Sequence, residues 1–198
     1  DRLLVDQLLI QGVNHVFCVP GESYLGVLDA LHDARAIKLV VNRHESGSTF
    51  MAEAYAKLSG QPGVAFVTRG PGATNAAIGI HTAFQDSTPM VVFIGQVGSD
   101  FVEREAFQEI DYRRMFGPMT KWVAQIDRAD RVPEYVARAF QIATSGRPGP
   151  VVLALPEDMQ AQTAQVPDAM CHQTVQCAPS DTQIAALRRA LGQYLSHN

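Results

Sequence analysis

Short apolar segments alternate with helical patterns along this sequence, and this alternation limits the folds available to it. The segments expected to form strands are 15–20, 37–43, 63–69, 90–97 and 150–156, with a weaker sixth at 121–126. Most are apolar at consecutive positions, which predicts burial on both faces of a parallel sheet. Helical periodicity occupies 3–11, 24–33, 46–58, 73–85 and 130–144. This order predicts an α/β fold, with a mainly parallel central sheet of about six strands and helices on both faces.

The ends of the first four strands fall at a regular interval. Pro20, Glu45, Gly70 and Gly95 lie there, 25 residues apart each time. If the strands are parallel, their carboxyl ends share one edge of the sheet, and open α/β sheets bind ligands at that edge. Glu45 is therefore expected to lie near two Gly/Pro-rich turns, 20–23 and 69–75. Ser46 is the expected N-cap of the following helix and Gly60 its expected stop.

Composition and charge exclude several classes of protein. The 198 residues are 46% hydrophobic and carry a formal net charge of −4 without a run of like charges, so neither nucleic acid nor an anionic membrane is expected as partner. No apolar stretch approaches the ~18 residues of a membrane span. An odd count of 3 cysteines fits a reducing compartment, and the first residues lack a secretion signal. We therefore expect a cytoplasmic protein.

The character of the sequence changes near residue 160. Residues 1–159 are expected to form one domain, and the polar, weakly periodic segment 160–179 to form a linker. Residues 180–198 begin with a capping residue, Ser180 or Asp181, and continue with apolar positions at helical spacing. A single amphipathic helix after a linker has nothing of its own to pack on. It is expected to be the first helix of a middle domain that the sequence cuts short.

Glu45 admits two interpretations from the residues alone. A carboxylate in the first turn of a helix is favoured by the helix dipole, by ~0.3–1 kcal/mol, and needs no chemical role. Alternatively, burial would make its protonated form accessible, so that it could exchange a proton with a nitrogen of a ligand. Arg43 and His44 could equally hold it ionised as a structural pair, and composition does not decide between these cases.

Three other motifs give only weak indications of a functional site. The segment "GPGATN" at 70–75 differs from a dinucleotide fingerprint because Asn75 replaces the third glycine, so a tight turn is the simpler interpretation. The segment "PGESYL" at 20–25 has Leu25 where a nucleophile elbow needs glycine. Cys171, His172 and Cys177 match no common zinc spacing, so no metal site is predicted in this chain.

Several blocks, taken in order, resemble one known family. They are "PGES" at 20–23, "RHE" at 43–45, "GPGATN" at 70–75, "GQV" at 95–97, "AFQE" at 106–109, "TK" at 120–121 and "SGRPGPV" at 145–151. This order is similar to the N-terminal pyrimidine-binding domain of thiamin diphosphate-dependent enzymes, in the acetolactate synthase and pyruvate oxidase branch. The resemblance runs from about residue 3 to residue 159.

The resemblance implies roles for individual residues. In that family the glutamate matching Glu45 hydrogen-bonds N1′ of the cofactor's aminopyrimidine and exchanges a proton with it, which would make Glu45 the catalytic residue. Pro20, Gly21, Pro71 and Asn75 would also contact the cofactor. The substrate side would be faced by Ser23, Phe107 and Gln108.

The resemblance further implies a reaction on a small 2-oxo acid, decarboxylation or carboligation. Mg²⁺ and the diphosphate are held in this family by a Gly-Asp-Gly motif in a C-terminal domain, and the motif does not occur in this sequence. This chain alone is therefore expected to be inactive. A homodimer or homotetramer through the pyrimidine-binding domain is expected, and whether FAD is bound stays open.

Two positions depart from the acetolactate synthase pattern. Glu22 stands where a glycine is usual, and Glu157 stands where a lysine is usual. Carboxylates there are expected to disfavour a second anionic 2-oxo acid as acceptor. The alternatives are a 2-oxo acid decarboxylase, oxidase or lyase of the same family, a non-catalytic subunit with this fold, and, more remotely, a nucleotide-dependent oxidoreductase.

Overall fold

The computed structural model describes residues 1–175 and 178–196 and contains one six-stranded sheet. The strands are β1 (His15–Cys18), β2 (Lys38–Val41), β3 (Gly63–Val67), β4 (Met90–Gln96), β5 (Trp122–Gln125) and β6 (Pro150–Pro156). Their order across the sheet is β2-β1-β3-β4-β6-β5, and each pair is parallel. The predicted α/β class and the weaker sixth strand are confirmed.

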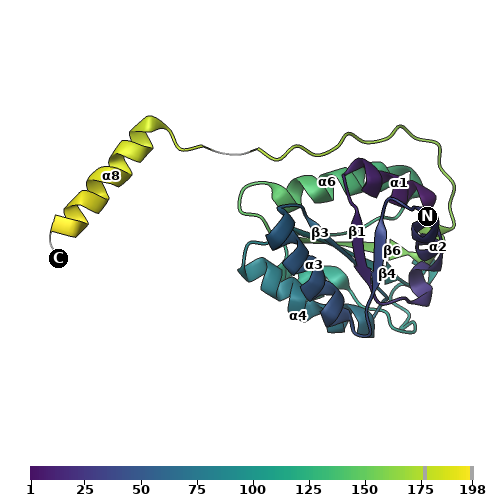
Figure 1. Cartoon of the computed structure of the whole chain (residues 1–198). Coiled ribbons are helices and arrows are strands. Elements are labelled where there is room, and N and C mark those ends of the chain that lie inside the picture. The colour runs from purple at the N-terminus through teal and green to yellow at the C-terminus, as the bar shows by residue number, and fades with distance from the viewer. Residues whose placement is uncertain (176–177, 197–198) are drawn as a thin grey trace.

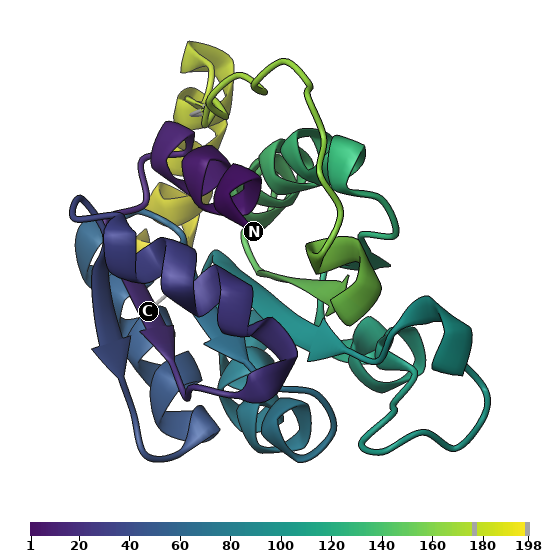
Figure 2. The same cartoon turned by 90° about the vertical axis from the view of Figure 1, so that its right-hand side faces the viewer.

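Helices cover both faces of the sheet (Figures 1 and 2). One face packs against α1 (Arg2–Ile10), α2 (Leu25–Asp33) and α6 (Val132–Thr144). The other packs against α3 (Glu45–Ser59), α4 (Pro71–Gln85) and the short α5 (Tyr112–Phe116). Every residue of β3, β4 and β6 is buried, as expected for apolar strands sandwiched between two helical layers.

Helix α3 begins one residue earlier than predicted, and its predicted cap is wrong. The N-cap is His44, whose Nδ1 accepts a hydrogen bond from the backbone N–H of Ser46 at 3.3 Å. Ser46 is instead the second residue of the helix, so Glu45 occupies the first. A histidine side chain takes the place of the usual hydroxyl cap, because its ring nitrogen accepts a hydrogen bond from a backbone N–H that has no partner within the helix. The predicted stop is confirmed, since Gly60 caps the helix at φ 72°.

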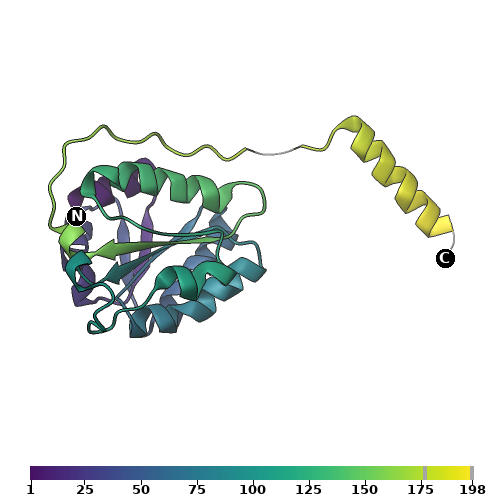
Figure 3. The same ribbon diagram turned by 180° about the vertical axis from the view of Figure 1, so that it is seen from behind.

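The segment after β6 starts with α7 (Glu157–Gln160) and then continues without further helix or strand in its described residues up to α8 (Asp181–Ser196). Two buried glutamines of the α1 region hold it against the domain. Gln7 bonds to Asp168 and to the N–H of Ala169, and Gln11 bonds to the carbonyl of Met170. Figure 3 shows the segment passing over α6 toward α8, whose described side chains are not buried.

No helix within the described ranges is both long and apolar enough to cross a membrane. Cys177 lies outside the described residues, so the Cys171–His172–Cys177 group is not observed as a unit. Across residues 1–175 and 178–196, no cluster of three or more His, Cys, Asp or Glu side chains is arranged to hold a metal ion.

Candidate functional site

The candidate site lies where the chain reverses direction across the sheet. From β1 the chain moves outward to β2 and then returns to β3 on the other side of β1. The turns after β1 and β3 therefore face each other at the carboxyl edge, and such a switch point is where open α/β sheets bind ligands. Their contact is close, because a Cβ on Gly21 would lie 2.6 Å from Cβ of Thr68.

Glu45 is at this edge and is 9% exposed. Its Oε2 accepts a hydrogen bond from Nδ2 of Asn75 at 3.0 Å. Glu45 is the first residue of α3, and Asn75 is the fifth residue of α4. Helix α4 begins with Pro71, at a position where the missing N–H costs nothing. The carboxylate therefore lies at the positive end of the α3 dipole, which stabilises its negative charge, and it accepts one hydrogen bond from an amide side chain.

A glycine, Gly72, packs closely against this carboxylate. A Cβ on Gly72 would lie 3.3 Å from Oε1 of Glu45 and 2.7 Å from the methyl carbon of Thr68. A larger residue at 72 would therefore press on both side chains. Gly72 therefore lets the start of α4 lie close against the carboxylate of Glu45.

Ser23 is buried under the turns instead of opening on the edge. Its hydroxyl lies 2.7 Å from Oγ1 of Thr68 and accepts a hydrogen bond from the N–H of Arg69 at 3.3 Å. A Cβ on Gly95 would lie 1.9 Å from the Ser23 hydroxyl oxygen. The hydroxyl therefore joins the ends of β1, β3 and β4, which gives Ser23 a positioning role within the fold.

Tyr112 joins the same strand ends from the other face. Its hydroxyl accepts a hydrogen bond from the N–H of Gly70 and donates one to the carbonyl of Gly95, each at 3.1 Å. Burial raises the pKa of Tyr112 to about 12, so the donating phenol persists at neutral pH. Sequence inspection missed Tyr112, because one turn of helix after an irregular loop carries no periodic signal.

Replacing Tyr112 by Phe is expected to destabilise the chain by about 1–3 kcal/mol, because the buried N–H of Gly70 loses its acceptor. Urea unfolding at pH 7 measures the loss. The raised pKa favours the protonated phenol in the folded state, so this residue's contribution to stability persists below its ordinary value near 10 and declines as the pH rises toward 12. Tyr55→Phe is the matched control, because Tyr55 donates to the exposed Asn14. Equal losses in both variants would contradict this role for Tyr112.

The loop between β4 and α5 carries two of the predicted substrate-facing residues and projects from the body of the fold (Figure 2). The side chain of Phe107 is 73% exposed. Gln108 has φ 64° and packs on Gly70, where a Cβ would lie 2.6 Å from Cβ of Gln108. The carboxylate of Glu109 accepts from the N–H groups of Glu103 at 2.6 Å and Ala106 at 3.1 Å, so Glu109 fixes the loop's shape.

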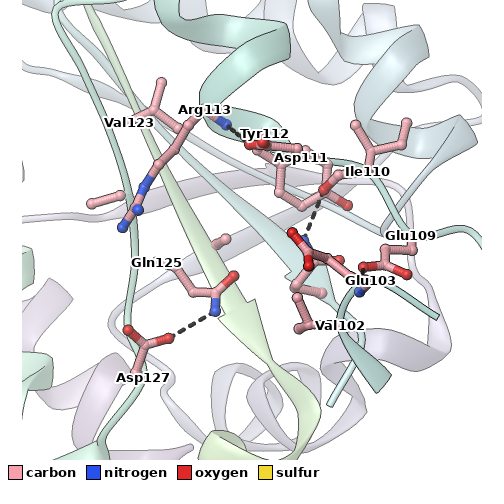
Figure 4. Close-up of a pocket in the computed structure, with 13 residues that line it drawn as sticks. Val102, Glu103, Glu109, Ile110, Asp111, Tyr112, Arg113, Val123, Gln125 and Asp127 are labelled. Carbon is pink, nitrogen blue, oxygen red and sulfur yellow. Dashed lines mark hydrogen bonds between the residues drawn. The ribbon is translucent and has the colours of Figure 1, made fainter. Parts of the chain in front are cut away.

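A cavity of about 290 Å³ lies between this loop and the carboxyl ends of β4, β5 and β6 (Figure 4). Its charged lining residues are Glu103, Glu109, Asp111, Arg113 and Asp127. Gln96 closes one side by donating to the carbonyl of Ile110 at 2.9 Å. The cavity is separate from the Glu45–Asn75 pair, because neither residue lines it.

Sequence inspection treated Glu22 and Glu157 as two separate negative charges, and the structure joins them. Arg69 Nη2 lies 3.0 Å from Oε1 of Glu22, and Arg69 Nη1 bonds to Oε1 of Glu157. Glu22 follows β1, Arg69 follows β3 and Glu157 follows β6. No local signal could have revealed this cluster, because Glu157 is 88 positions from Arg69 in the chain.

Cys18, at the end of β1, is buried, and its burial raises the pKa of its thiol to about 11 from an ordinary 9.0. Iodoacetamide at pH 8 is therefore expected to alkylate the exposed Cys171 and to spare Cys18, because the thiolate is the reactive form. Peptide mass mapping measures the extent of alkylation at Cys171 and at Cys18. Rapid labelling of Cys18 in the folded chain would contradict its burial, and labelling in urea is the positive control.

Comparison with known proteins gives a family for this arrangement. A family model described as thiamine pyrophosphate enzyme, N-terminal TPP binding domain, matches residues 1–115, which is more than half of the chain. Among curated proteins, the mitochondrial acetolactate synthase catalytic subunit of Aspergillus candidus is 46% identical over 156 residues, or 79% of this chain and 22% of that protein.

Two bacterial acetolactate synthase large subunits are also similar to this chain. The acetolactate synthase large subunit of Buchnera aphidicola subsp. Schizaphis graminum is 42% identical over 162 residues, 82% of this chain and 28% of that protein. The acetolactate synthase isozyme 3 large subunit of Escherichia coli is 42% identical over 166 residues, 84% of this chain and 29% of that protein. The chain thus spans between 22% and 29% of the length of these three relatives.

Proposed function

This chain belongs to the thiamine pyrophosphate enzyme family as an N-terminal cofactor-binding domain of the acetolactate synthase branch, and from that premise we propose the function of the whole protein. It is an enzyme that uses thiamin diphosphate and Mg²⁺ to decarboxylate a small 2-oxo acid and to join the remaining acyl group to an acceptor. The relatives named acetolactate synthases support this reaction class.

The buried Glu45–Asn75 pair, against which Gly72 packs, is the observation that carries the proposal. When bound, thiamin diphosphate supplies the electron sink for decarboxylation. Glu45 holds a proton between its carboxylate and a ring nitrogen of the pyrimidine, and its low exposure keeps water from competing for that proton. Asn75 orients the carboxylate, and Pro20, Gly21 and Pro71 line the turns around the ring.

Phe107 and Gln108 face the substrate in this proposal. Gln108 rests on Gly70, the residue that ends the turn before α4, so the loop and the cofactor turn are in direct contact. Glu109 positions the loop through its two backbone hydrogen bonds. Ser23 positions the turn after β3 and is a supporting residue with no exposed hydroxyl.

The remaining parts of the enzyme lie in other regions of the protein. We assign residues 1–159 to the pyrimidine-binding domain, 160–179 to a linker and 180–198 to the first helix of a middle domain. Mg²⁺ and the diphosphate would be held by a C-terminal domain, and a flavin would be held mainly by the middle domain. The odd cysteine count supports the proposed cytoplasmic location, and the Aspergillus candidus relative is named mitochondrial.

The proposal includes a homodimer or homotetramer formed through this domain. Helices α3 and α4 contact each other closely and expose large apolar side chains on their outer surfaces. These side chains are Phe50, Met51, Leu58 and Ile78. Exposed apolar side chains on two adjoining helices are typical of a surface that another chain covers. Light scattering of the whole protein measures the assembly.

The test of this function is CO₂ release by the whole protein from a panel of 2-oxo acids, with and without thiamin diphosphate and Mg²⁺. Cofactor-dependent release is expected, and the best substrate identifies the donor. A single product without carboligation would indicate a decarboxylase, and consumption of O₂ would indicate an oxidase. Release that does not depend on the cofactor, or no release from any acid, would overturn the proposed activity.

A further inference from the structure

Tyr24 holds the turn after β1, which carries Pro20 and Gly21, from within the core. Val19 lies one residue beyond β1 and directly precedes Pro20, and its carbonyl accepts a hydrogen bond from the hydroxyl of Tyr24. The same hydroxyl lies 3.4 Å from the carbonyl oxygen of Phe66 in β3. One phenol thus joins the ends of the two strands that flank the point where the chain reverses direction.

The surroundings of this phenol leave it little freedom. Tyr24 is 1% exposed, and its ring packs on that of Phe66 with the ring centroids 5.8 Å apart. Burial raises the pKa of Tyr24, and the nearby Cys18 and Glu45 raise it further, so the hydroxyl remains a hydrogen-bond donor at neutral pH. The phenol therefore lies within electrostatic range of the carboxylate that we propose as the catalytic group.

Gln160 holds the same turn from α7, of which it is the last residue. Its Nε2 donates to the carbonyl of Ser23 at 2.8 Å and to the carbonyl of Leu155 at 3.0 Å. Since Nε2 carries two hydrogens, both hydrogen bonds can form together. Leu155 belongs to β6, so this amide ties the turn after β1 to a strand three places away in the sheet.

Gln160 is itself held in place by the residues that follow it. The side chain of Gln162 accepts a hydrogen bond from the N–H of Ala129 at 3.0 Å. Ala164 packs against the buried core on the α1 side of the sheet. A donor fixes a turn only when the donor is itself fixed, and these contacts fix Gln160.

Pro20 and Gly21 consequently lie between two anchored residues. Val19 is held before them by its carbonyl, and Ser23 is held after them by its carbonyl and by its hydroxyl, 2.7 Å from Oγ1 of Thr68. The ring of Pro20 restricts its own φ. A Cβ on Gly21 would lie 2.6 Å from Cβ of Thr68, so the turn is also pressed against the end of β3. Contacts within the protein therefore determine the shape of this turn.

From these contacts we propose that Tyr24 and Gln160 are positioning residues for the cofactor. They hold Pro20 and Gly21 in the conformation that receives the pyrimidine ring, so that the ring does not have to order the turn when it binds. A binding surface that is ordered in advance avoids the entropy loss of ordering and therefore binds more tightly. The inference rests on the proposed function, because it needs thiamin diphosphate as the ligand of this turn.

Calorimetric titration of the whole protein with thiamin diphosphate in the presence of Mg²⁺ tests the inference. Tyr24→Phe and Gln160→Met remove the hydrogen-bond donors and nearly keep the shapes of the side chains. Each is expected to raise the dissociation constant about tenfold, the factor that corresponds to one buried hydrogen bond. The rate of CO₂ release at saturating cofactor should stay within about threefold of wild type, because both residues act on the turn and not on the reacting atoms.

Gln162→Met and Tyr55→Phe are the matched controls. Gln162 lies two residues after Gln160, but it bonds to Ala129 and not to the turn after β1. Tyr55 donates to the exposed Asn14. Both controls should bind thiamin diphosphate with the dissociation constant of the wild type.

A purely structural role for Tyr24 and Gln160 would lower the stability of their variants to urea without changing the dissociation constant. An unchanged dissociation constant in either Tyr24→Phe or Gln160→Met would therefore overturn the inference, and so would an equal increase in the two controls. A wild type that does not bind thiamin diphosphate would instead contradict the proposed function.

Hydrogen exchange followed by mass spectrometry gives a second test that needs neither cofactor nor activity. In the wild-type whole protein without thiamin diphosphate, a peptide spanning residues 19–25 is expected to exchange slowly, because the turn is already ordered. Tyr24→Phe and Gln160→Met should each speed this exchange about tenfold and leave peptides of β4 unchanged. Exchange of the wild-type turn as fast as that of the urea-unfolded protein would overturn the inference, and this outcome does not depend on how well either variant folds.

Discussion

Replacing Glu45 by Gln in the whole protein is expected to lower the cofactor-dependent rate of CO₂ release by on the order of 10²–10⁴-fold, the usual contribution of a positioned acid–base group. Gln keeps the shape of the side chain and can still accept the hydrogen bond that Asn75 donates. What it loses is the capacity to take and return a proton. The steady-state rate at saturating thiamin diphosphate measures the effect.

Glu53→Gln provides the matched control for this prediction. Glu53 is on the same helix, α3, and is also buried, but it bonds to Thr88 and Lys57, remote from the start of the helix. Its neutralisation should alter stability and leave the cofactor-dependent rate within about threefold of wild type, because it contacts no part of the proposed site. Equal rates in wild type and Glu45→Gln would show that Glu45 has only a structural role.

Gly63→Ala should destabilise the chain strongly, because the first residue of β3 lies directly against the backbone of α3. A Cβ at position 63 would lie 2.0 Å from the carbonyl oxygen of Ala52 and 2.6 Å from its carbonyl carbon. Since both are main-chain atoms, the clash cannot be relieved by rotating a side chain. We expect a loss at or above the upper end of the ~1–3 kcal/mol typical of overpacking, measured by urea unfolding.

Gly117→Ala is the comparison that isolates this clash. Gly117 has φ −49°, and a Cβ there would meet nothing within 4 Å. The substitution should stabilise the chain by about 0.4–1 kcal/mol, because alanine restricts the unfolded state without strain in the folded one. A Gly63→Ala protein as stable as Gly117→Ala would mean that α3 moves away from β3 at little cost. Such a movement would also displace Glu45, so the proposed site would be less rigid than described.

The expected positions of the strands and main helices held because local patterns determine them. Apolar runs such as 90–97 and 150–156 have few alternatives to burial in a sheet, and Gly60 ends α3 because glycine readily adopts its positive φ. Where the local signal was short, the expectation was incomplete. The cap of α3 depends on one ring nitrogen of His44, and α5 is held to the strand ends by the hydroxyl of Tyr112. Neither contact produces a periodic pattern in the sequence.

By itself, the sequence determined the α/β class and the regular spacing of four strand ends, and both follow from hydrophobic periodicity. The candidate role of Glu45 came from the resemblance of several blocks, taken in order, to one family. Only the tertiary structure decided which side chains meet at that edge. It turned Glu22 and Glu157 from two separate charges into the partners of Arg69, and it buried Ser23, which was expected to face the substrate. Contacts between residues dozens of positions apart depend on the order and register of the strands, and no local pattern encodes them.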